Sequence, residues 1–173
     1  MKWINASKIA AALLVGLTFA GAAEAATNTP AEIANMKLVT DFYSALDAAN
    51  SAGTMAQRAR EISERFISPD YVQHQEGPPT SGNAREAFIH SAESMPPGAL
   101  PPAMRTPAKT VALMAEGDRV IQVTSREAPN PAGGAREVFI FNMFRIANGQ
   151  LAEHWDALPA ALMGPPPGGP GQR

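Results

Sequence analysis

The Asn-Gly pair at residues 148–149 constrains this chain most, because it separates two mostly apolar runs. Asn-Gly between such runs is the strongest short-range signal for a tight hairpin turn, so residues 136–146 and 150–158 are predicted to pair as antiparallel strands. Side chains alternate between the two faces of a strand, which places His154 and Asp156 on one face. An imidazole and a carboxylate so placed can move protons, hold a metal or complete a buried hydrogen-bond network.

The rest of the chain changes its periodicity from helical to strand-like. Apolar residues recur at helical spacing in residues 30–50 and 54–66, and a third amphipathic stretch covers 83–94. A short strand is predicted at 71–74, and from residue 109 onward apolar residues alternate with a period of two. Helices followed by strands predict an α+β fold, in which three helices pack on one face of a curved antiparallel sheet and enclose a cavity.

The two ends of the chain have compositions of their own. A basic start and an apolar stretch at 9–20, too short to span a bilayer, precede the Ala-Glu-Ala motif at 23–25. Residues 1–25 are therefore predicted to be a secretory signal peptide, which makes the mature protein periplasmic or secreted. The domain itself is expected at 30–158, and the Pro- and Gly-rich segment 159–173 is predicted to be a disordered tail.

Charge and cysteine content exclude several classes of function. The formal net charge is -2 and no basic cluster is present, so we expect no nucleic-acid partner and no membrane binding after signal cleavage. The chain has no cysteine, so the exported domain must be held together by packing alone.

Four segments, in this order, resemble the SnoaL-like polyketide cyclase group of the nuclear transport factor 2-like superfamily. They are Ser68-Pro69-Asp70-Tyr71-Val72-Gln73-His74, Ala115-Glu116-Gly117-Asp118-Arg119-Val120, Phe144-Arg145-Ile146 with Asn148-Gly149, and Glu153-His154-Trp155-Asp156. The resemblance covers about residues 36–158 and implies a cone-shaped fold that often forms homodimers and normally works without a metal. It implies no single activity, because the fold includes isomerases, dehydratases, cyclases and proteins without chemistry.

The resemblance also suggests roles for particular positions. His74 stands where ketosteroid isomerases of this fold carry the carboxylate base, and Tyr43 resembles their aromatic hydroxyl. The SnoaL-like group usually has an Asp where this chain has Asn142, and often a His where it has Val123. Two of the expected polar positions thus lack a titrating group.

These observations lead to a hypothesis of cofactor-free proton transfer on a small hydrophobic carbonyl compound. The catalytic candidates are His74, His154 and Asp156, and the ligand-binding candidates are Tyr43, Asn142, Phe144 and Leu158. Asp156 or His74 would take a proton next to the carbonyl, His154 would orient or relay, and Tyr43 or Asn142 would hydrogen-bond the developing enolate oxygen.

Three alternatives remain open at this point. The same residues can bind a ligand without turnover, which the lost titrating groups at Asn142 and Val123 favour. They can be a structural network in which His154 and Asp156 tie the last strand to the first. His74, His154 and Asp156 also have the composition of a facial metal triad, two imidazoles and one carboxylate.

The opposite face of the last two strands carries large apolar side chains. Phe139, Phe141, Met143 and Trp155 share that face by parity. An exposed apolar patch of this size usually finds a partner, so we expect a homodimer formed through the sheet faces.

Overall fold

The computed structural model describes residues 27–74, 83–96, 105–130, 132–157, 159 and 162. The predicted signal peptide, Leu158 and nearly all of the predicted tail lie outside these residues, so the expectations for them stay predictions. The elements, in chain order, are α1 (Pro30–Ser51), α2 (Met55–Phe66), β1 (Ile67–His74), α3 (Ala84–Glu93), β2 (Lys109–Glu116), β3 (Arg119–Pro129), β4 (Ala135–Ala147) and β5 (Gln150–Ala157).

Local sequence signals explain where several of these elements begin and turn. Thr29 caps α1 in a capping box with Glu32, and Asn83 caps α3 by accepting from two backbone N–H groups. The turn between β4 and β5 holds Asn148 and Gly149 at φ values of 51° and 72°. Both values are positive, as the tight hairpin turn requires, so the predicted β4–β5 hairpin is confirmed.

The five strands form one mixed sheet in the order β1-β5-β4-β3-β2. β2, β3, β4 and β5 pair antiparallel, as predicted, whereas β1 pairs parallel to β5. The prediction of a wholly antiparallel sheet is therefore wrong at this edge. The reason is that β1 lies between α2 and α3 in the chain and has no hairpin partner, so no turn determines its direction beside β5.

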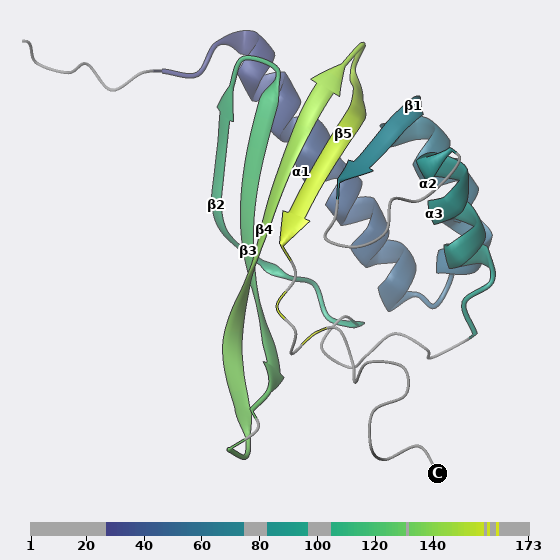
Figure 1. The fold of residues 1–173 in the computed structure, drawn as a ribbon, viewed down its shortest axis with the longest axis vertical. Coiled ribbons are helices and arrows are strands. Elements are labelled where there is room, and N and C mark those ends of the chain that lie inside the picture. The colour runs from purple at the N-terminus through teal and green to yellow at the C-terminus, as the bar shows by residue number, and fades with distance from the viewer. Residues whose placement is uncertain are drawn as a thin grey trace, which may run out of the picture.

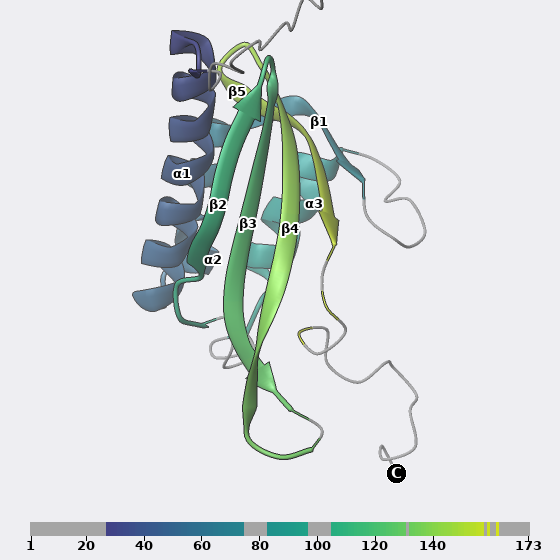
Figure 2. The same ribbon diagram turned by 90° about the vertical axis from the view of Figure 1, so that its left-hand side faces the viewer.

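The three helices cover one face of the curved sheet, as Figures 1 and 2 show. The core between them is apolar and includes Phe42 of α1, Ile62 of α2, and Phe144 and Leu151 of the sheet. β4 occupies the middle of the sheet, and its even-numbered residues 138–146 are buried. Phe144 and Ile146 pack in the core with the helices, whereas Val138 and Ile140 pack with Ala128 and Leu162. The predicted α+β fold, three helices against a curved sheet, is confirmed. None of the described helices is both long enough and apolar enough to span a membrane.

Candidate functional site

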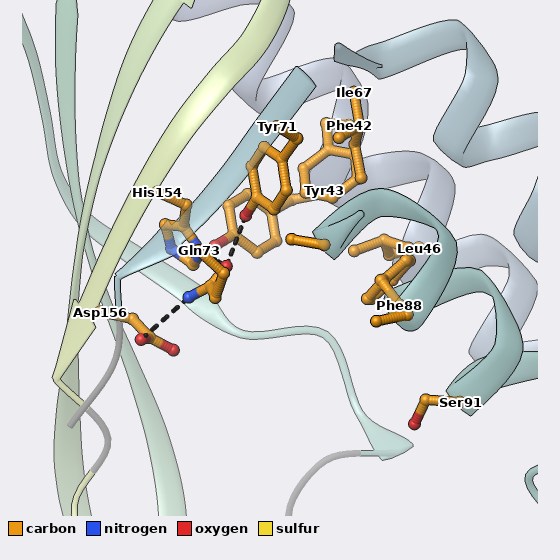
Figure 3. Close-up of a pocket in the computed structure, with 12 residues that line it drawn as sticks. Phe42, Tyr43, Leu46, Ile67, Tyr71, Gln73, Phe88, Ser91, His154 and Asp156 are labelled. Carbon is orange, nitrogen blue, oxygen red and sulfur yellow. Dashed lines mark hydrogen bonds between the residues drawn. The ribbon is translucent and has the colours of Figure 1, made fainter. Parts of the chain in front are cut away.

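Two adjoining cavities lie between the helices and the sheet. The first, of about 420 Å³, is mostly apolar and is lined by residues of α1, β1, α3 and β5, including Phe42, Leu46 and Phe88. The second, of about 340 Å³, is lined by polar side chains of α1, β2, β3 and β4. Tyr43, His154 and Asp156 line both cavities, so they form the boundary where the two meet. Figure 3 shows the apolar cavity and these three side chains.

His154 is held firmly in this boundary. Its ring stacks on Phe144 with 4.2 Å between ring centroids and an interplanar angle of 3°. Its Nδ1 lies 3.0 Å from Gln73 Oε1 and its Nε2 lies 3.1 Å from Asn142 Oδ1. Burial lowers the pKa of His154 from 6.5 to about 4, so the ring is neutral at pH 7. A neutral ring carries one N–H, so one nitrogen remains an acceptor, and a half-turn of the Asn142 amide would supply a donor to it.

Gln73 connects the polar residues of this boundary. Its Oε1 accepts a 2.5 Å hydrogen bond from the Tyr71 hydroxyl and faces His154 Nδ1, while its Nε2 donates to Asp156 Oδ1 at 3.3 Å. The dashed lines in Figure 3 show the bonds to Tyr71 and Asp156. Because donation to Asp156 fixes the direction of the amide, the oxygen of Gln73 faces the ring and His154 Nδ1 carries the proton.

Burial shifts the pKa values of two further boundary residues, Asp156 and Tyr43. Partial burial raises the pKa of Asp156, and the hydrogen bond from Gln73 opposes this rise. Burial raises the pKa of Tyr43 well above its usual value, and the nearby Asp156 charge adds to this effect. Tyr43 therefore stays a hydroxyl donor at neutral pH, next to a carboxylate whose basicity is increased.

The polar cavity also contains an ion pair between β3 and α1. Nη2 of Arg126 on β3 lies 3.9 Å from Oδ1 of Asp47 on α1, and the same guanidinium donates to the carbonyl oxygen of Thr106. Gln122 on β3 and Asn142 on β4 are register partners, and both line this cavity. The cavity thus presents a carboxylate, a guanidinium and amides on one side of the Tyr43–His154–Asp156 boundary.

His74 does not join these residues, so the expectation that it faces the same hollow is wrong. Its Nε2 lies 2.8 Å from Glu153 Oε2, and its ring stacks on Trp155 at 4.4 Å between centroids. Gln73 is the register partner of His154, which places His74 on the opposite face. Val72, which shares a face with His74, is exposed, whereas Tyr71 and Gln73 line the apolar cavity.

The same finding removes the metal triad as a set of ligands. His74 lies on the outer face of the sheet, away from the cavities that His154 and Asp156 line. Within the described part of the chain, no group of three His, Cys, Asp or Glu residues is placed to hold a metal ion.

Of the four predicted ligand-binding residues, the structure places two in the cavities. Tyr43 lines both cavities and Asn142 lines the polar one. Phe144 lines neither: it is buried in the core behind His154, between that ring and Tyr43, so the expectation that it contacts ligand is wrong. Leu158 lies outside the described residues.

Gln73, Gln122 and Arg126 are site residues that the sequence interpretation missed. Parity offers a signal for Gln122 and Arg126. Both have the parity of the buried Val120 and face the cavity, whereas Val123 pairs with Phe141 on the outer face of β3. The resemblance drew attention to Val123, one residue away from the side chain that reaches the cavity.

Comparison with solved structures supports the fold. A candidate SnoaL-like polyketide cyclase from Jannaschia Sp. CCS1 is similar with a TM-score of 0.51 and 20% identity, covering 82% of this chain and 100% of that one. An NTF2-like protein of unknown function from Burkholderia pseudomallei K96243 is similar with a TM-score of 0.50 and 16% identity. The match covers 75% of this chain and 94% of that one. An LEH-like epoxide hydrolase from M. tuberculosis is similar with a TM-score of 0.50 and 11% identity. The match covers 79% of this chain and 86% of that one.

No protein-family model matches the sequence, and no curated protein matches it either. These three structures are at most 20% identical to this chain, so they establish the fold alone. The resemblance found in the sequence, to SnoaL-like proteins with the nuclear transport factor 2-like fold, is therefore confirmed at the level of the fold.

Proposed function

We propose that this protein binds a small hydrophobic carbonyl compound in its cone and removes a proton next to the carbonyl, without a cofactor. The observation that carries the proposal is the convergence of two cavities on Tyr43, His154 and Asp156. An apolar cavity with a few convergent polar groups is the usual form of a small-molecule site. Two of the three convergent groups, Tyr43 and His154, also have strongly shifted pKa values, which is common at functional sites.

Each of the three residues has a distinct role in the proposed step. Asp156 takes the proton from the carbon next to the carbonyl, and the electron pair of the broken C–H bond moves to the carbonyl oxygen. Tyr43, which keeps its proton, donates a hydrogen bond to the resulting enolate oxygen. Neutral His154 is fixed between Gln73 and Asn142, and its ring forms the wall against which the reacting group lies. Return of the proton at another carbon, or attack of the enolate on a second carbonyl, would give isomerase or aldol-type chemistry.

The test uses 2-tetralone, a bicyclic ketone with acidic protons next to its carbonyl, dissolved in D₂O. Nuclear magnetic resonance follows the exchange of these protons for deuterium. Wild-type protein should accelerate the exchange, and Asp156→Asn should lose roughly 100-fold or more of that acceleration. Asp118→Asn, an exposed turn carboxylate, and His74→Ala, on the outer face, should both keep it. Full exchange activity in Asp156→Asn would rule out Asp156 as the base.

A second candidate function is binding without turnover. It is favoured by Asn142 and Gln73, whose amides cannot titrate and which hydrogen-bond to His154 and Asp156. Under this alternative 2-tetralone would raise the melting temperature of the protein, while its exchange rate would stay at the value in buffer.

We also place the mature protein outside the cytoplasm, because residues 1–25 have the charge and apolar pattern of a signal peptide. Expression of the full chain in a Gram-negative host should give a periplasmic product that lacks residues 1–25. Intact mass spectrometry of the periplasmic and cytoplasmic fractions measures this, and an uncleaved cytoplasmic product would contradict it.

A further inference from the structure

The amide of Gln122 is the most conspicuous unused polar group in the described part of the chain. The residue is 3% exposed and lines the polar cavity, yet its Oε1 has no hydrogen-bond partner among the described residues. A buried amide without a partner destabilises a folded protein, so its retention in a cavity wall points to a ligand group. Gln122 lies on β3, one strand further from the Tyr43–His154–Asp156 boundary than Asn142 on β4.

We propose that the polar cavity binds a neutral hydroxyl group of the ligand, which hydrogen-bonds to the side-chain amide of Gln122. This inference rests on the proposed function, because it assumes that the apolar part of the same ligand fills the neighbouring cavity. A hydroxyl suits the position because one oxygen atom both donates and accepts. It can donate to Gln122 and accept a hydrogen bond from a neighbouring donor on the same wall, such as the amide of Asn142.

The charges of the cavity favour a neutral group over an acid. Two carboxylates, Asp47 and Asp156, line it together with one guanidinium, Arg126. Arg126 already faces Asp47 at 3.9 Å and donates to the Thr106 carbonyl oxygen. A ligand carboxylate would therefore meet two like charges in a partly desolvated space, which opposes its binding. The ligand class is thus an apolar molecule with a carbonyl near Asp156 and a hydroxyl at the Gln122 end.

Three probes of similar shape separate the contributions of body and head group. 2-Methylnaphthalene supplies the apolar body alone, 2-naphthol replaces its methyl group with a hydroxyl, and 2-naphthoate carries a carboxylate. Their affinities are measured by titration into ¹⁵N-labelled protein. Wild-type protein should bind 2-naphthol roughly ten-fold tighter than 2-methylnaphthalene, which corresponds to one buried hydrogen bond. It should bind 2-naphthoate more weakly than 2-naphthol.

The variant Gln122→Leu removes the amide and keeps a side chain of similar size. It should lose the ten-fold preference for 2-naphthol while it still binds 2-methylnaphthalene. Gln57→Leu, a matched change at an exposed position of α2, should keep the preference. In wild-type protein, the side-chain NH₂ signals of Gln122 should shift on addition of 2-naphthol and stay in place with 2-methylnaphthalene, a readout that needs no variant.

The outcomes distinguish this inference from the proposed function. If 2-methylnaphthalene binds but the hydroxyl adds no affinity, or 2-naphthoate binds tightest, the hydroxyl subsite is overturned and the apolar cavity stands. If Gln122→Leu keeps the full preference for 2-naphthol, the subsite lies elsewhere and the inference is overturned. If none of the three probes binds, both the inference and the proposed ligand class fail.

Discussion

The site depends on single residues whose positions are set by amides rather than by charges. Gln73 accepts from Tyr71, faces His154 and donates to Asp156, so one side chain sets the orientation of both the imidazole and the carboxylate. This arrangement realises the predicted tie between the last strand and the first, since Gln73 lies on β1 while His154 and Asp156 lie on β5. The proposed active site and the structural network thus share the same residues, because a network that fixes geometry is also what preorganises a proton-transfer site.

His154 should make the stability of the protein depend on pH. Burial lowers its pKa in the folded state to about 4, whereas an unfolded chain has a value near 6.5. The unfolded state therefore binds a proton between these values that the folded state does not. The contribution of His154 to the free energy of unfolding should be constant above about pH 6.5 and should fall as the pH drops toward 4. At pH 5 it should be about 2 kcal/mol lower than at neutral pH.

Urea denaturation at pH 7 and pH 5 measures this effect as a difference between variants. His154→Gln should show a smaller loss between the two pH values than wild type, whatever its stability at pH 7. Asp47 and Asp156, whose pKa values are raised, act in the opposite direction and are common to both proteins. His90→Gln, on the exposed surface of α3, should behave as wild type. Equal pH dependence in wild type and His154→Gln would show that His154 titrates normally.

At the scale of elements, the sequence predicts whatever depends on local periodicity. The three helices, the β2–β3 hairpin and the β4–β5 hairpin follow from helical spacing, alternation and turn residues, all of which act within one element. The position of β4 in the middle of the sheet follows from its apolar residues on both faces. These features need no knowledge of distant contacts.

β1 is where local reasoning fails. Its direction beside β5 and the face that each side chain takes depend on pairing across about 80 residues of sequence. Ile67, Tyr71 and Gln73 share one parity and line the apolar cavity, while Val72 and His74 face outward. A one-residue change of parity exchanges the two faces of a strand, which is why Gln73 replaces His74 in the site. His154 and Asn142 escaped this error: each lies on the face that its parity predicts, His154 opposite Phe144 and Asn142 opposite Asp156.

At the scale of the whole molecule, the two faces of the sheet differ in what covers them. The helices cover the cavity face, and no described element covers the other (Figure 2). That outer face carries Val72, Met114, Ile121, Phe139 and Phe141, all exposed, beside the stacked His74 and Trp155. Glu153, which hydrogen-bonds to both His74 and Arg145, lies on the same face. An exposed apolar patch of this size is typical of a protein interface.

We therefore expect a homodimer through this face, and Phe141 is the position that tests it. Phe141 is 55% exposed in the single chain and lies on the central strand of the sheet, so a lysine there would place a charge within the contact. Phe141→Lys should convert a dimer to a monomer in sedimentation velocity at micromolar concentration. Ile33→Lys is the matched control: Ile33 is equally exposed at 55% but lies on α1, so this variant should stay dimeric. A wild-type protein that sediments as a monomer would refute the dimer, and a Phe141→Lys dimer would place its interface elsewhere.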